Sequence, residues 1–190
     1  MLPIAIKPII ESLLDFVLEN TSSSEQVSLL DEHYRSLPDI IAFSNHKFYG
    51  NSLRVMSSTP ANKGRQSVFI KKVGGVQDEN GTNSLEAEAI LIHIKEVIVQ
   101  EEELPNEHCS SIGVLSPFRN QTDYLSEYFK THLTFEDIKR HKIRLGTPYH
   151  FQGEERDIML LSMALDNNSH PAGFKYLNKE DVFNVAITRA

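Results

Sequence analysis

The hydrophobic pattern along the chain predicts alternating helices and strands. Apolar residues at helical spacing predict helices over residues 8–19 and 83–100, the second of which begins with a capping-box-like pair, Asn83 and Glu86. Helices are also predicted over residues 38–45 and 120–133. Strands are predicted at residues 67–73, 111–115 and 143–147 and, as an almost continuous apolar run, at 158–165. A final helix is predicted from Asn184. This alternation is typical of an α/β fold with a mostly parallel central sheet flanked by helices.

Composition narrows the class of protein. The 190 residues are 40% hydrophobic and 24% charged, which fits one globular domain. Cys109 is the only cysteine, so an internal disulfide or a multi-cysteine zinc site is excluded. The pattern predicts no membrane span and no signal peptide, because the apolar runs are short and charges interrupt the first of them. We expect a cytoplasmic location, or a nuclear one in a eukaryotic cell.

The charge balance is acidic, with a formal net charge of -7 and a pI near 5.6. Phosphate contacts require a cationic surface, so charge alone does not favour nucleic-acid binding. Basic residues nevertheless cluster at Lys63 and Arg65, at Lys71 and Lys72, and over residues 139–144. A translocating motor needs only weak binding to each segment of a nucleic-acid strand. The negative net charge therefore argues more strongly against a DNA-binding repressor than against a motor.

A polar turn separates the two last predicted strands. Thr147 precedes Pro148 and should be extended, while Gly153 allows a ligand or a second backbone to approach closely. Residues 116–119 follow another predicted strand, at the sheet edge where open α/β folds bind ligands. The sequence therefore predicts two candidate ligand-binding segments, the polar turn and residues 116–119.

Four segments, in order along the chain, resemble a known family. They are His33-Tyr34-Arg35-Ser36-Leu37-Pro38 followed by Phe48-Tyr49, then residues 112–121, then Thr147 to Asp157, then Asn184-Val185-Ala186-Ile187-Thr188-Arg189-Ala190. They are similar to the opening segment and to motifs IV, V and VI of the second RecA-like domain of Upf1-like superfamily 1B helicases. The resemblance implies a RecA-like, P-loop NTPase-type fold and the C-terminal half of an ATP-dependent nucleic-acid helicase.

The resemblance also implies an ATP site shared with a first RecA-like domain of the same protein, which binds most of the ATP and Mg²⁺. Arg35 and Arg189 are implied to be the catalytic arginines at the γ-phosphate. The residues implied to bind the nucleotide are Tyr34, stacked on the adenine, Gln152, Gly153 and, near the ribose, Glu155.

Single-stranded DNA or RNA is the other implied partner. Thr147 and Pro148 are implied to face the backbone of the strand. Pro117, Phe118 and Gln121 are implied to lie near the nucleic-acid path or the nucleotide cleft. Arg119 is grouped with them, but it could serve either ligand or neither.

The family motifs also predict the organisation of the chain. Residues 1–24 are expected to be a helix and linker that follow motif III, and residues 25–190 the second RecA-like domain, truncated at its C-terminus. No Gly-rich loop with Lys and Ser or Thr occurs in the sequence, so Asp31-Glu32 is a poor match to a Walker B element and the isolated chain is predicted to be inactive.

Two departures from the family pattern leave an alternative open. Ser36-Leu37 replaces Met-His, and Asp181-Val182-Phe183 replaces Arg-Arg-Leu and removes positive charge beside the cleft. A degenerate, non-catalytic helicase-like scaffold or nucleic-acid-binding module therefore competes with the motor. A free-standing Rossmann domain is disfavoured because no Gly-x-Gly-x-x-Gly loop is present.

Overall fold

The computed structural model describes residues 16–17, 20–21, 28, 30–34, 36–60, 64, 66–151 and 153–178. The chain divides into two compact units, residues 1–32 and 33–190. The predicted helix over residues 8–19 lies largely outside the described residues, and the predicted helix from Asn184 lies wholly outside them. The division predicted between residues 24 and 25 stays a prediction.

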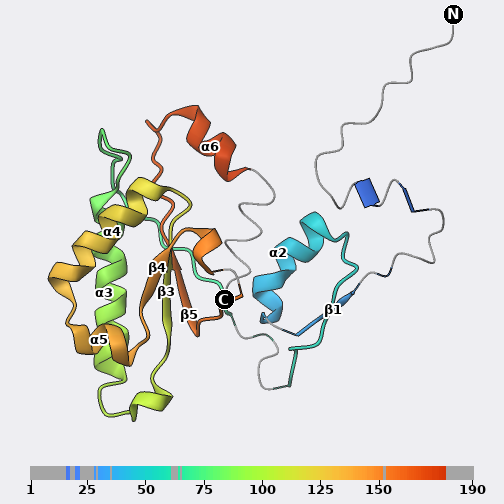
Figure 1. Cartoon of the computed structure of the whole chain (residues 1–190), viewed down its shortest axis with the longest axis horizontal. Helices are drawn as coiled ribbons and strands as arrows, with labels where there is room; N and C mark the ends of the chain where they lie inside the picture. Colours follow the sequence, from blue (N-terminus) through green and yellow to red (C-terminus); the bar gives the residue numbers. More distant parts are fainter. Residues whose placement is uncertain are drawn as a thin grey trace, which may run out of the picture. The chain divides into compact units, whose positions relative to one another are not determined.

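Among the residues that the structure describes, three parallel strands form the central sheet, which confirms the predicted α/β class (Figure 1). β3 (Ile112–Leu115) lies between β4 (Arg144–Gly146) and β5 (Ile158–Leu161). Val114 is in register with Leu145 on one side and with Leu160 on the other. All four residues of β3 are buried, as the apolar run predicts for a central strand.

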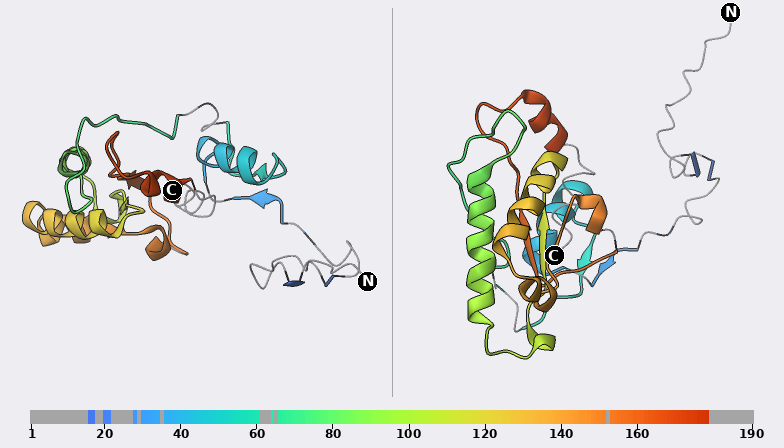
Figure 2. Two further views of the ribbon diagram at one scale, coloured as in Figure 1. Left: turned by 90° about the horizontal axis from the view of Figure 1, so that it is seen from above. Right: turned by 60° about the vertical axis from the view of Figure 1, so that its left-hand side comes forward.

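Two helices, α3 (Ser84–Gln100) and α4 (Arg119–His132), pack against the central strand of the sheet. Both match the predicted helices, and Figure 2 shows α3 beside α4. Their apolar faces pack with β3 in one cluster, whose buried members are Ala87, Ile90, Leu91, Ile94, Val97, Ile112, Val114, Leu125, Phe129 and Leu133. Burial of this many apolar side chains is the main stabilising term of the fold.

Shorter elements join these helices and strands. A 3-10 turn, η2 (Asn106–His108), precedes β3, and α5 (Phe135–Arg140) precedes β4. α5 begins with a complete capping box, in which Thr134 accepts from the Asp137 N–H and the Asp137 carboxylate accepts from Thr134. The cap explains why a helix of only six residues forms here.

A separate group of elements surrounds α2 (Pro38–Phe48), which runs three residues beyond its predicted end at Asn45. β1 (Glu32–His33) and β2 (Arg54–Val55) form a two-stranded sheet, extended by a bond of 2.7 Å from the Met56 N–H to the His33 carbonyl. The Asn45 amide bonds both the N–H and the carbonyl of Leu53, at 3.0 and 2.9 Å. This side chain fixes the turn that closes α2.

The strand predicted over residues 67–73 is wrong. These residues have no regular structure, and Phe69 and Ile70 are 77% and 95% exposed. A strand is stable only when its backbone pairs with a neighbour. Among the described residues, the sheet consists of β4, β3 and β5, and residues 67–73 pair with neither outer strand.

The run predicted as a strand over residues 158–165 ends four residues early, at Leu161. Ala164 adopts a φ of 55°, a left-handed conformation that interrupts an extended strand. The chain then reaches α6 (Pro171–Leu177), a helix that the sequence pattern did not reveal. None of the described helices combines the length and the apolar character that crossing a membrane requires.

Candidate functional site

The carboxyl ends of the three parallel strands lie at one edge of the sheet. Ser116 follows β3, Thr147 follows β4 and Ser162 follows β5. The Ser116 N–H donates to the Gly146 carbonyl at 3.1 Å, and the Ser162 N–H donates to the Leu115 carbonyl at 2.9 Å. Strand pairing thus brings the predicted motif IV and motif V segments to the same edge, as expected for a ligand-binding edge of an α/β sheet.

The segment after β4 is held by a histidine that the sequence analysis did not assign. η3 (Pro148–Phe151) turns the chain so that His150 Nδ1 lies 3.1 Å from the Thr147 N–H and 2.9 Å from the Thr147 hydroxyl. A Cβ atom at Gly146 would lie only 2.7 Å from the Cβ of His150, so this close turn requires glycine. Thr147 therefore has a fixed orientation at the edge.

The other predicted residues of this turn differ in exposure. Pro148 is buried, whereas Gly153 is exposed and has a φ of 77° with open space on the Cβ side, as expected of a turn glycine. Glu155 is exposed, and its carbonyl accepts a bond of 2.8 Å from Arg156. Gln152 lies outside the described residues.

Two arginines stiffen the second half of the turn. The Glu154 carboxylate forms ion pairs with Arg144 of β4 and with Arg156, the latter at 2.8 Å. Arg144 also donates to the His150 carbonyl at 3.0 Å. The basic residue of β4 is thus used inside the turn, and its charge is compensated by Glu154.

The residues of motif IV fall into exposed and buried groups. Ser116 and Pro117 are buried, and the Ser116 hydroxyl accepts a bond of 3.2 Å from the Phe118 N–H. Phe118 is half-buried and Arg119 is exposed. Of this group, Phe118 and Arg119 present the larger surface to a ligand.

Gln121 is completely buried, which the resemblance did not indicate. Its amide oxygen accepts from the Asn83 N–H at 2.8 Å, and its amide nitrogen donates to the Asn83 carbonyl at 3.1 Å and to the Ser162 hydroxyl at 3.0 Å. Both amide hydrogens and the oxygen are therefore used within the protein. Gln121 joins the starts of α3 and α4 to the segment after β5.

Glu86 completes this buried network. Asn83 caps α3 as predicted, by accepting from the Glu86 N–H at 3.1 Å, but Glu86 does not return the bond. Its carboxylate accepts instead from the Ser162 hydroxyl at 2.6 Å and from the Ala164 N–H at 2.9 Å. The second bond explains how Ala164 is held in its left-handed conformation.

The structure describes only some of the residues that were predicted to contact the nucleotide. Tyr34 is 65% exposed. The neighbouring turn is fixed by a bond of 2.9 Å from the Ser36 N–H to His33 Nε2 and by a bond of 2.6 Å from the Ser57 hydroxyl to the Ser36 carbonyl. Arg35, Arg189 and the departure at Asp181-Val182-Phe183 lie outside the described residues.

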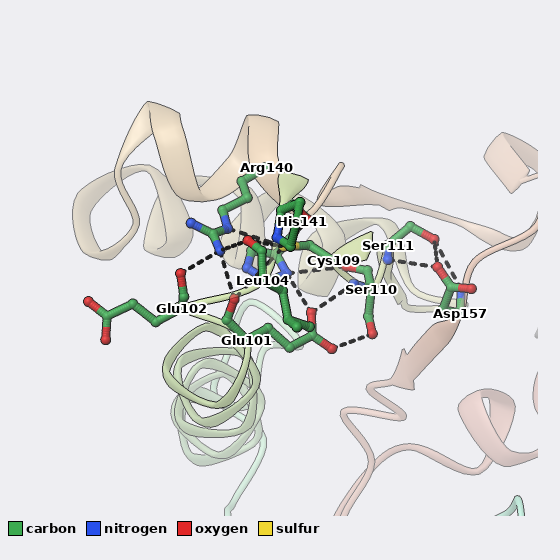
Figure 3. Close-up of polar contacts among 10 residues, drawn as sticks. Glu101, Glu102, Leu104, Cys109, Ser110, Ser111, Arg140, His141 and Asp157 are labelled. Atoms are coloured by element: carbon green, nitrogen blue, oxygen red, sulfur yellow. Dashed lines mark hydrogen bonds and ion pairs between the residues drawn. The ribbon is translucent and has the colours of Figure 1, made fainter. Parts of the chain in front are cut away.

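A second polar cluster lies at the amino ends of the strands (Figure 3). Glu101, Cys109 and His141 each have one atom of a kind that binds metal ions, and these three atoms lie within 4.8 Å of one another. The guanidinium of Arg140, however, donates to the Cys109 sulfur at 3.2 Å and to the carbonyls of Glu101, Glu102 and Leu104, each at 2.7 Å. A fixed positive charge against the sulfur opposes the binding of a metal cation. We therefore assign this cluster a structural role, in which Arg140 binds the carbonyls just beyond the C-terminal end of α3.

Asp157 stabilises the same end of the sheet. Its carboxylate accepts from the Ser111 hydroxyl at 2.6 Å and from the Ser111 N–H at 2.8 Å. These two bonds lower the pKa of Asp157 from its ordinary value of 3.8. A lowered pKa in the folded state means that the stabilisation is present above pH 4 and is lost as the pH falls through the folded-state pKa.

We therefore expect Asp157→Asn to lower the free energy of unfolding at pH 7 and to reduce its loss between pH 5 and pH 3. Urea unfolding at a series of pH values measures both quantities. Asp78 and Asp166, whose pKa values are also lowered by hydrogen bonds, are present in both proteins and cancel in the comparison. Ser111→Ala removes the hydroxyl bond to the carboxylate and the bond of 3.1 Å that the Asp157 N–H donates to this hydroxyl, but keeps the Ser111 N–H bond, so its pH dependence should be intermediate. Parallel pH profiles for the wild type and Asp157→Asn would contradict this account.

Comparison with known proteins gives a consistent family signal. The family model described as an AAA domain matches residues 9–190. The chain is 26% identical, over 94% of its length, to DNA polymerase alpha-associated DNA helicase A of Saccharomyces cerevisiae. It is 28% identical, over 92% of its length, to helicase sen1 of Schizosaccharomyces pombe.

A bacterial relative gives a similar match. The chain is 31% identical, over 94% of its length, to an uncharacterized ATP-dependent helicase of Mycoplasma genitalium. It spans 28%, 11% and 16% of the yeast, fission yeast and Mycoplasma proteins, respectively.

Proposed function

Because the chain belongs to the AAA domain family of Upf1-like superfamily 1 helicases and is a RecA-like domain of the helicase type, we propose that it is the C-terminal RecA-like half of an ATP-dependent helicase. The observation that supports this best is the shared carboxyl edge. β3 and β4 are adjacent and parallel, so the segment that carries Phe118 and Arg119 and the segment that begins at Thr147 both leave the sheet at its carboxyl edge. Both proposed nucleic-acid segments thus lie on one side of the domain.

The ATP site is proposed to be shared with a first RecA-like domain of the same protein, which supplies the phosphate-binding loop and the ligands of Mg²⁺. The present chain is proposed to supply Tyr34 for the adenine and Gln152, Gly153 and Glu155 for the rest of the nucleotide. It is also proposed to supply Arg35 and Arg189 for the γ-phosphate. Arginines suit this role because phosphoryl transfer depends on positioning and on charge stabilisation. The exposed side chain of Tyr34 is compatible with stacking on a base.

The nucleic-acid strand is proposed to cross the carboxyl edge of the sheet. Thr147, whose hydroxyl is oriented by His150, is proposed to contact the phosphate backbone, and Phe118 and Arg119 are proposed to contact the strand from the segment after β3. Pro117 and Pro148 are buried and shape these two turns. Gln121 is not proposed as a ligand contact, because its amide has no exposed surface. Its proposed role is to position Asn83 and Ser162.

Titration of the chain with fluorescent single-stranded DNA and RNA oligomers tests this proposal. We expect weak binding that decreases with salt, because one domain offers one wall of the channel and carries a net charge of -7. Thr147→Val should weaken binding, whereas Thr131→Val on the exposed face of α4 should leave it unchanged. We also expect no ATP hydrolysis by the chain alone. Salt-insensitive binding, or turnover that survives rigorous purification, would contradict the proposal.

A further inference from the structure

We propose that Tyr176 of α6 and Phe118 of motif IV form an aromatic platform on which a base of single-stranded nucleic acid stacks. The inference rests on the proposed function and adds to it a contact in α6. Tyr176 lies outside the four motif segments that resemble the helicase family.

Two contacts fix α6 at the carboxyl edge of the sheet. Gly173 lies against Leu165, since a Cβ atom there would be 3.0 Å from the Leu165 Cδ2. The rings of Tyr176 and Phe118 lie 5.8 Å apart between centroids and are tilted by 53°. Figure 1 shows α6 at the end of the sheet where α4 begins. α6 is therefore held beside the proposed path of the strand.

The surface around the two rings suits a nucleic-acid strand. Phe118 and Tyr176 are both half-buried, so part of each residue remains at the surface. Arg119 follows Phe118, Lys175 precedes Tyr176, and both cations are exposed. Although the chain has a net charge of -7, each of the two aromatic residues thus has an exposed cation next to it in the sequence. Stacking on aromatic rings with cations along the backbone is the common mode of sequence-tolerant single-strand binding.

Affinity measurements test the platform directly. We expect Tyr176→Ala to weaken binding of an oligo-dT strand by roughly tenfold or more, because base stacking depends on the ring. Tyr176→Phe keeps the ring and should bind as the wild type does. An oligomer of abasic deoxyribose phosphates should bind the wild type and Tyr176→Ala equally, since it retains the phosphates and lacks the bases.

Fluorescence gives a second, independent test. The chain contains no tryptophan, so Tyr176→Trp introduces a single reporter. We expect oligo-dT to quench its emission and the abasic oligomer to leave it unchanged. Tyr124→Trp is the matched control, because Tyr124 stacks on Tyr128 within α4, 5.9 Å between centroids. Its emission should not respond to either oligomer.

The outcomes separate this inference from the proposed function. If the wild type binds no single strand, the proposed function fails. If the wild type binds, but folded Tyr176→Ala binds with equal affinity, the platform is excluded and the ring pair only anchors α6. If Tyr176→Ala does not fold, the Tyr176→Trp response decides, and emission unaffected by oligo-dT would overturn the inference.

Discussion

In the proposed helicase with two RecA-like domains, replacing Arg189 by alanine is expected to lower ATP turnover by roughly a thousandfold or more, the effect associated with arginine fingers. The guanidinium is always charged and forms two parallel hydrogen bonds to phosphate oxygens. Arg189→Lys should retain part of the charge but lose this geometry, so it should also impair turnover. Steady-state phosphate release in the presence of single strands measures the effect.

Three measurements on the same variants identify how Arg189 acts. If it stabilises the transition state, nucleotide-free binding of single strands and the melting temperature should stay near the wild-type values while turnover falls. If it is a structural arginine, turnover, strand affinity and melting temperature should fall together. Wild-type turnover in Arg189→Ala would remove the catalytic assignment.

Gln121→Leu is expected to lower the free energy of unfolding by about 3 kcal/mol, because a buried hydrogen-bonding group left without its partner costs about 1–3 kcal/mol. Leucine has a similar size but leaves the Asn83 N–H, the Asn83 carbonyl and the Ser162 hydroxyl without the Gln121 amide. Urea unfolding measures the loss, provided that the slope of the transition stays the same.

The neighbouring residue provides a matched control. The Asn120 side chain is exposed and donates one bond of 2.6 Å to the Asn80 carbonyl, so Asn120→Leu should cost less than about 1 kcal/mol. If Gln121→Leu instead kept wild-type stability and lost affinity for nucleotide or single strands, Gln121 would be a ligand contact, as the family resemblance implied.

The parts of the fold that were predictable are those in which local pattern and tertiary packing agree. The apolar run at residues 111–115 is the buried strand β3, and Asn83 caps α3 as expected. The apolar residues at 67–73 show the limit, because they have strand-forming side chains but no pairing partner among the described residues. Strand propensity describes a segment, whereas pairing depends on residues far away in the sequence.

The sequence predicted where the site lies better than it predicted the contacts between its side chains. The sequence placed residues 116–119 at the carboxyl end of a strand, and strand pairing shows that the segment from Thr147 lies at the same edge. The burial of Gln121 depends on α3 and on Ser162, and the orientation of Thr147 depends on His150. A sequence pattern does not encode such contacts between side chains. Tyr176 was missed for the same reason, since only the packing of α6 brings it to Phe118.

The position of β3 between two later strands has a consequence for biosynthesis. The ribosome completes Ile112–Leu115 before it makes either β4 or β5, so this apolar strand leaves the exit tunnel without a pairing partner. α3 is already complete by then and can shield one face of the strand, but both backbone edges stay open until Gly146 and Leu161 have emerged. Chaperone demand during translation should therefore be greatest over this interval.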